Sequence, residues 1–222
     1  MLQGSPTKNG TGISIYGDYG DLKALYETVH GIAKAIDEEC IESEAQIDLL
    51  MNFAYEIRKA YSGQRLNTKH IFEGDDKELS YCGFHCVWTD LLIFISVLRH
   101  NSGYVQTNKL QQANLYLLEY LTEKALFEND SEGADLIKNY IGQKINITQK
   151  YAFILYQALH LNFIIEKGGK RRFRDIPQLI NNHFSEYREE YKALIQSLKK
   201  SAKDQDCQIT DLEFADFPEI NW

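Results

Sequence analysis

The spacing of apolar residues changes near the start of the chain from two to three or four. Ile13 and Ile15 alternate with polar residues and predict a short β-strand. Residues 22–36 then carry apolar side chains at helical spacing and predict an amphipathic helix. Asp18 precedes this helix and Asp21 follows three residues later, so both carboxylates are placed to meet the unpaired amide groups of the first turn. We therefore expect a strand that leads directly into a capped helix.

Residues 69–73 and 79–88 predict two further strands, joined through a turn at 74–77 whose composition suits a hairpin. Together with the first strand they would form a small antiparallel sheet. Side chains alternate between the two faces of a strand. One face is therefore expected to be covered and to carry Cys82, Phe84, Cys86 and Trp88, with Tyr81, His85 and Val87 on the opposite face.

The rest of the pattern is almost entirely helical. Apolar spacing and capping residues predict helices over 41–61, 89–98, 107–125, 131–141 and 148–165. Thr89 is expected to be an N-cap, and the helix at 148–165 is apolar nearly all round, which places it in the centre of the fold. A last helix is expected to run unbroken from near Pro177 to about Lys200. The fold class is thus α+β, a mainly helical single domain with about seven helices and a small antiparallel sheet.

Length and composition agree with one domain over residues 1–222. The chain is 44% hydrophobic and 25% charged with only three prolines, as in ordinary globular domains. Its formal net charge of −8 opposes the binding of nucleic acid or an anionic membrane by the surface as a whole. Any site for an anion would have to be local.

The predicted location is the cytoplasm. The start of the chain lacks a basic stretch followed by an apolar run, so no secretory signal is expected. The most apolar segment, 151–165, is interrupted by polar residues and is too short to span a bilayer. The four cysteines, at positions 40, 82, 86 and 207, are then expected to be reduced thiols and not a disulfide framework.

Candidate metal ligands and catalytic carboxylates each have a simpler structural explanation. Cys82, His85 and Cys86 are residue types that bind zinc, but on a strand the histidine faces away from both cysteines. Five carboxylates could converge beside the sheet, namely Asp18, Asp21, Glu73, Asp75 and Asp76. Asp18 and Asp21 already suit helix capping and Asp75 and Asp76 suit a turn. A metal-dependent enzyme using the carboxylates near Asp18 is therefore only a third hypothesis. We predict no catalytic residue, no metal and no cofactor.

Residues 167–174, the basic segment, carry five positive charges around two glycines. The basic residues, Lys167, Lys170, Arg171, Arg172 and Arg174, could bind a phosphate or a nucleic-acid backbone. They equally suit the negative end of a helix that Gly168 terminates. The segment is therefore either an anion site or an ordinary connection between helices.

Residues 204–222, the tail, combine acidic side chains with three aromatic ones, Phe214, Phe217 and Trp222. Burial of aromatic side chains would stabilise a packed tail. We therefore expect the tail to pack on the body, with the basic segment as one place where it could dock.

Three stretches resemble a family of uncharacterised bacterial proteins of about this length. They are Gly-Asp-Tyr-Gly-Asp-Leu-Lys-Ala-Leu-Tyr at 17–26, the stretch from Tyr-Cys-Gly-Phe through Val-Trp-Thr-Asp-Leu to Leu-Arg-His at 81–100, and Arg-Phe-Arg at 172–174. The resemblance spans most of the chain. Its motifs are structural, so it implies no activity, ligand or catalytic residue.

The leading hypothesis from sequence is a non-enzymatic cytoplasmic interaction protein without a cofactor. It would bind a protein partner or copies of itself, because the tyrosine-rich sequence can present aromatic contact area and no catalytic motif occurs. The alternatives are a nucleic-acid or phosphate-binding protein acting through the basic segment, and a metal-dependent enzyme. No membrane partner is predicted.

Overall fold

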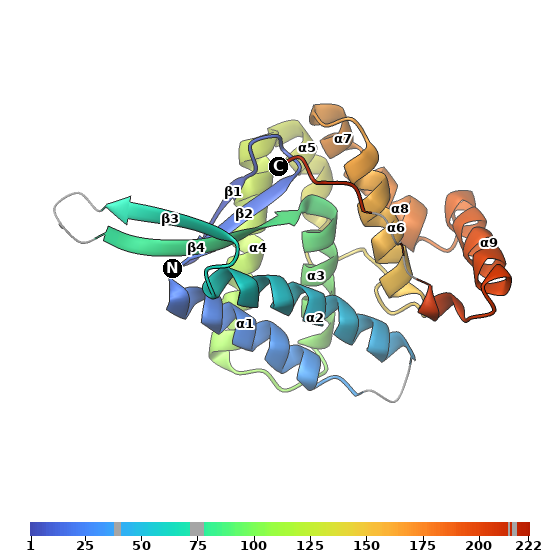
Figure 1. Cartoon of the computed structure of the whole chain (residues 1–222), viewed down its shortest axis with the longest axis horizontal. Helices are drawn as coiled ribbons and strands as arrows, with labels where there is room; N and C mark the ends of the chain where they lie inside the picture. The colour runs from blue at the N-terminus through green and yellow to red at the C-terminus, as the bar shows by residue number, and fades with distance from the viewer. Residues whose placement is uncertain (38–40, 72–77, 213, 215–216) are drawn as a thin grey trace.

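The computed structural model describes residues 1–37, 41–71, 78–212, 214 and 217–222. It confirms the α+β fold, with a small antiparallel sheet and helices packed around it (Figure 1). The strands are β1 (Gln3–Pro6), β2 (Gly12–Gly17), β3 (Leu66–Ile71) and β4 (Glu78–Val87). The α-helices are α1 (Tyr19–Lys34), α2 (Ile41–Tyr61), α3 (Trp88–Asn101), α4 (Lys109–Asn129), α5 (Ser131–Ile137), α6 (Ala152–Ile165), α7 (Lys170–Arg174), α8 (Ile176–Phe184) and α9 (Glu189–Asp204), with short 3-10 turns at Lys138–Tyr140 and Ile209–Asp211.

The strands lie in the order β1-β2-β4-β3, and every neighbouring pair is antiparallel. The first part of β4 pairs with β3 as far as Gly83, which lies opposite Leu66. Residues 84–87 of β4 pair with β2 alone, where Phe84 lies opposite Ile15. The other edge of residues 84–87 therefore has no neighbouring strand in the part of the chain that the structure describes.

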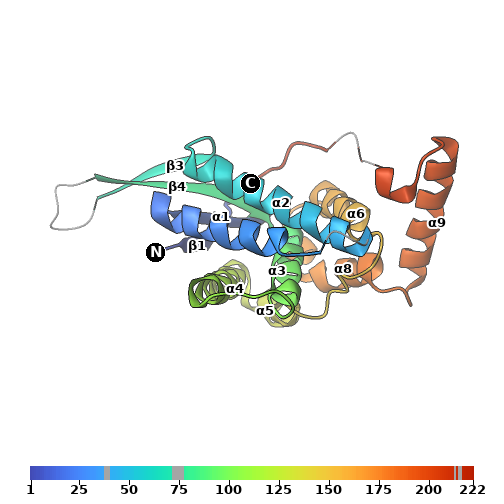
Figure 2. The same cartoon turned by 90° about the horizontal axis from the view of Figure 1, so that it is seen from below.

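The helices cover the sheet and enclose α3. Helices α1 and α2 lie side by side along the sheet (Figure 2), and Phe53 of α2 meets Phe84 of β4 edge to face with ring centroids 6.0 Å apart. Every residue of α3 from Trp88 to Leu98 is buried, as expected for a helix with neighbours on all sides. The prediction that residues 148–165 form the central helix is wrong, because α6 leaves Ile165 62% exposed while α3 is the helix enclosed by the others.

The predicted unbroken last helix is also wrong. The chain leaves α8 after Phe184, adopts an extended conformation at Ser185 and starts again as α9. Phe184 is buried, whereas Tyr187 is 92% exposed and does not belong to a buried stripe. The break allows α8 to pack on α6 while α9 takes a different direction (Figure 2).

The strand boundaries differ from the prediction at two places. Trp88 opens α3 and does not end the strand, so the N-cap of this helix is Val87 and not Thr89. Strand β1 was not predicted because residues 3–6 have no apolar alternation, and backbone pairing with β2 forms it. The predicted hairpin turn at 74–77 lies outside the described residues.

Asp18 caps α1 as the sequence predicts. Its Oδ1 accepts a hydrogen bond from the amide of Asp21 at 2.8 Å, and Asp21 Oδ2 accepts one from the amide of Asp18 at 3.3 Å. We predict that Asp18→Ala lowers the free energy of unfolding by about 1 kcal/mol, because it leaves an amide of the first turn without its partner. Urea denaturation measures this loss. Asp18→Asn, which keeps a capping oxygen, is the control and should stay near the wild type; equal stability of all three proteins would contradict the capping role.

Candidate binding site

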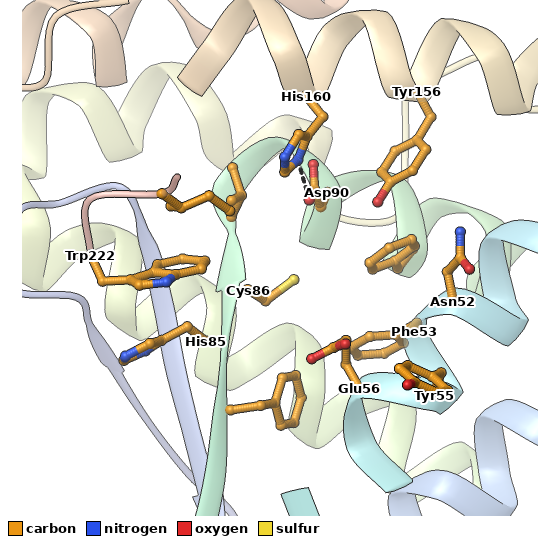
Figure 3. Close-up of a pocket in the computed structure, with 14 residues that line it drawn as sticks. Asn52, Phe53, Tyr55, Glu56, His85, Cys86, Asp90, Tyr156, His160 and Trp222 are labelled. Atoms are coloured by element: carbon orange, nitrogen blue, oxygen red, sulfur yellow. Dashed lines mark hydrogen bonds and ion pairs between the residues drawn. The ribbon is translucent and has the colours of Figure 1, made fainter. Parts of the chain in front are cut away.

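A cavity of about 370 Å³ lies where α2, β4, the start of α3, α6 and the end of the chain meet (Figure 3). Its walls are largely apolar or aromatic, with Phe53 and Tyr55 from α2, Phe84 and Val87 from β4, Phe94 from α3, and Ile220 and Trp222 from the tail. Its polar groups belong to Asn52, Glu56, His85, Cys86, Asp90, Tyr156 and His160. Apolar walls with a few polar groups at this volume are typical of ligand sites.

One end of the cavity holds a buried ion pair between α3 and α6. Asp90 Oδ2 lies 2.7 Å from His160 Nδ1, and these side chains are only 9% and 13% exposed. The hydroxyl of Thr89 donates to the other oxygen of Asp90 at 3.2 Å. Burial lowers the pKa of His160, but the charge of Asp90 and its hydrogen bond raise it more, so the net pKa lies above 6.5. The pair therefore carries opposite charges at mildly acidic pH.

Two weak acids face the same space. Figure 3 shows the thiol of Cys86 and the hydroxyl of Tyr156 directed into the cavity from β4 and α6. Burial raises the pKa of both groups well above their ordinary values, and the charges of Asp90 and Glu56 add to the effect. Glu56 is itself bound by Arg65, whose Nε and Nη2 donate to its carboxylate at 2.7 and 2.8 Å. Both weak acids therefore stay protonated at neutral pH.

The cavity also reaches the opposite face of β4, where His85 lies. Its Nδ1 is 2.9 Å from the hydroxyl of Ser14, directly across on β2, and its ring stacks on Trp222 with centroids 4.7 Å apart. Burial lowers the pKa of His85. Successive residues of a strand point to opposite faces. A cavity lined by all four residues of 84–87 must therefore lie along the edge of β4.

Residues 217–222, which we call the C-terminal segment, line the cavity through Ile220 and Trp222. The ring of Phe217 meets His160 edge to face, with centroids 5.6 Å apart. The hydroxyl of Thr11 donates to the backbone carbonyl of Asn221 at 2.7 Å. These contacts bring the end of the chain to the start of β2 and to α6 (Figure 1).

Among the described residues, acidic side chains of the body neutralise much of the basic segment. Arg174 binds both oxygens of Asp130, at 2.6 and 2.9 Å, and Lys170 lies 3.2 Å from the same carboxylate. The hydrogen bond from Arg174 is the main reason that the pKa of Asp130 lies well below its usual range. Arg174 also contacts Glu132 at 2.6 Å, and Arg171 contacts Asp175 at 3.7 Å.

The other basic residues lie beside a shallow hollow of about 660 Å³, which Lys167, Lys170, Arg171 and Arg172 line. Arg172 donates to the hydroxyl of Thr11 at 2.8 Å and covers the ring of Phe163. The structure thus brings four of the five predicted anion-binding residues to one hollow and turns Arg174 toward Asp130.

The candidate metal ligands do not come together. In the described ranges no group of three or more His, Cys, Asp or Glu side chains is arranged to hold a metal ion. The thiol of Cys82 contacts Asn67 at 3.4 Å, while Cys86 lies in the cavity and His85 on the opposite face of the strand. Asp18 and Asp21 are engaged in capping α1. The remaining candidates, Glu73, Asp75 and Asp76, lie outside the described residues.

The Asp90–His160 pair is not predicted by the sequence pattern. The two residues are separated by 70 positions, so no local spacing connects them. One signal was available, because His160 interrupts the most apolar segment of the chain. A polar residue inside such a segment needs a buried partner, and the structure supplies it from α3.

A comparison with known protein families matches almost the whole chain. A family model described as a domain of unknown function, DUF6904, matches residues 2–222. The chain belongs to this family. The DUF6904 match confirms the resemblance to a family of unknown function and assigns no activity. No curated protein and no solved structure matches the chain. Among the described residues, no helix combines the length and apolarity needed to cross a membrane.

The ion pair predicts two histidines with opposite titration behaviour. His160 should titrate above pH 6.5 and His85 below it, because Asp90 stabilises the charged form of the first and burial disfavours that of the second. In Asp90→Asn the pKa of His160 should fall below 6.5, since burial then acts without the carboxylate. Histidine NMR titration measures both shifts. His85 is the internal control and should not change; an unchanged His160 would contradict the ion pair.

The sign of the stability effect follows from the raised pKa. Stabilisation by the Asp90–His160 pair should be complete below about pH 6.5, the ordinary histidine value, and should be lost as pH rises through the pKa of the folded protein.

Proposed function

We propose that this protein is a non-enzymatic interaction protein that binds a largely apolar ligand in the cavity between α2, β4 and α6. The observation that carries the proposal is the buried Asp90–His160 pair at one end of a largely apolar cavity of about 370 Å³. Removing charged groups from water costs free energy. A buried ion pair beside an accessible cavity therefore favours a functional role for Asp90 and His160, namely orienting a ligand. The pair would supply the polar contact, and the aromatic walls would supply most of the contact area.

The protonation of the cavity groups supports binding over catalysis. A nucleophilic cysteine needs a lowered pKa, whereas burial raises that of Cys86. The raised pKa of Tyr156 keeps its hydroxyl neutral, and the raised pKa of His160 favours its charged form, which cannot accept a proton. The thiol of Cys86 and the hydroxyl of Tyr156 are thus in their less reactive, protonated states near neutral pH.

The basic segment is the second candidate site, for a phosphate or a nucleic-acid backbone. The hollow lined by Lys167, Lys170, Arg171 and Arg172 supports it. We rank it below the cavity because Lys170 contacts Asp130, Arg171 contacts Asp175, and Arg172 is partly covered. An anion there would compete with these contacts.

We propose the bacterial cytoplasm as the setting of this function. The described cysteines, Cys82, Cys86 and Cys207, are free thiols, which suits a reducing compartment, and the resemblance noted above is to bacterial proteins. Self-association would use the exposed aromatic side chains of α4, namely Tyr116 and Tyr120, which are 64% and 59% exposed.

Anilinonaphthalene sulfonate, a dye that fluoresces when it enters apolar cavities, tests the proposed site. We expect one saturable site per chain, and about tenfold weaker binding in Asn52→Tyr, equivalent to about 1.4 kcal/mol. Asn52 is an exposed residue of α2 at the wall of the cavity, so a larger side chain there narrows the cavity without removing a core contact.

Met51→Tyr is the matched control, because Met51 is the adjacent residue on α2, is 40% exposed and does not line the cavity. Its affinity for the dye should equal that of the wild type. The proposal would be contradicted if the wild type showed no saturable binding, or if the two variants bound the dye equally well.

A further inference from the structure

We propose that the ligand is an extended peptide segment that adds as a strand to the open edge of β4 at His85 and Val87. This inference rests on the proposed function, since it names the class of ligand that the cavity binds. Extended peptides add to sheet edges through backbone hydrogen bonds, and pockets for alternate side chains provide specificity.

The register of the sheet leaves this edge without a partner strand. β3 begins at Leu66, opposite Gly83, so it pairs with none of the residues 84–87. On the other side, β2 pairs with all four of them. The cavity lies along the unpaired side, because its lining includes all four residues of 84–87.

The direction of the backbone groups follows from one hydrogen bond. The amide of Trp88 donates to the carbonyl of Thr11 at 3.3 Å, on the side of β2. Paired and unpaired residues alternate along an antiparallel strand, so Cys86 also faces β2, while His85 and Val87 face the cavity. The open edge thus offers the amide and carbonyl of His85 and the amide of Val87. Among the described residues, none of these groups has a backbone partner on this side.

The side chains around the edge suit a peptide with alternating character. Peptide residues on the face of Phe84 and Cys86 would enter the apolar part of the cavity beside Phe53 (Figure 3). A residue on the other face would lie against His85 and Trp222, which stack on each other. We therefore expect apolar residues at alternate positions of the ligand.

The surroundings of the edge favour a single segment over a second copy of the sheet. The cavity that residues 84–87 line has α2 on one side and the C-terminal segment on another (Figure 3), which leaves room for one added segment. The C-terminal segment is neither helix nor strand, and it places Phe217 against His160 and Trp222 against His85. The surroundings of the cavity thus already accept aromatic side chains from one irregular chain segment.

Val87→Pro removes one donor of the edge with little other change to the backbone. Val87 has φ −65°, the value that proline requires, and its amide makes no hydrogen bond to the described residues. Proline is tolerated where a strand amide faces away from its partner strand. Val87→Ala is the matched control, because it shortens the buried side chain but keeps the amide.

The test selects phage-displayed random peptides on the full-length wild-type protein and measures the affinity of the synthetic winners by calorimetry. We expect enriched peptides with alternate apolar residues. They should bind Val87→Ala and lose at least about tenfold in affinity for Val87→Pro, as expected for one hydrogen bond and its geometry. Methylating the peptide amide that faces His85 should cause a similar loss. Urea denaturation should give similar unfolding midpoints for the two Val87 variants.

Three results would overturn the inference: no enrichment of peptides, equal binding by the two Val87 variants, or binding that survives methylation. If Val87→Pro did not fold, methylation of the peptide would still decide the question with the wild type. If the dye binds as described above but no peptide does, the cavity binds a ligand that is not a peptide, and only this inference fails. If neither binds, the proposed function fails as well.

Discussion

Strand β4 passes into α3 without a loop, and the position of the cavity depends on this junction. Val87 is both the last residue of β4 and the N-cap of α3, and Trp88 is fully buried behind it. The backbone amide and the indole N–H of Trp88 donate to the carbonyls of Thr11 and Gly10, at 3.3 and 3.0 Å. A Cβ at Gly12 would overlap the backbone of β4, so only glycine permits this close approach. The end of β4 is thus held against the turn that joins β1 to β2.

The junction determines which groups share the cavity. Cys86 and Asp90 lie on either side of it, so a strand residue and a residue of the first helical turn face the same space. Helix α6 is one of the helices that enclose α3, and its packing beside α3 brings His160 to Asp90. The late start of β3, at Leu66, leaves the last part of β4 open to that space. The Asp90–His160 pair and the unpaired edge of β4 therefore line the same largely apolar cavity.

Local signals predicted the parts of this structure that local sequence determines. The capping of α1 by Asp18 was predicted because its partner lies three residues away. Strand alternation likewise placed His85 and Cys86 on opposite faces. The Asp90–His160 pair could not be predicted, since helix packing alone brings these residues together. The open edge was also missed, because it depends on the exact residue at which β3 begins. The positive charges of the basic segment are evident from the sequence. Their partner Asp130 is not, because it lies between α4 and α5, far from the segment along the chain.

Amide hydrogen exchange measured by NMR tests the central claim that the edge of β4 is open at residues 84–87. The amide of Cys86 faces β2 and is paired there, so it should exchange slowly, only when the whole protein unfolds. The amides of His85 and Val87 face the cavity and should exchange much faster in the free protein, in spite of lying between protected neighbours. Fast and slow exchange should therefore alternate along this one strand. Equal protection of His85, Cys86 and Val87 would show that the edge is already paired and would contradict the account.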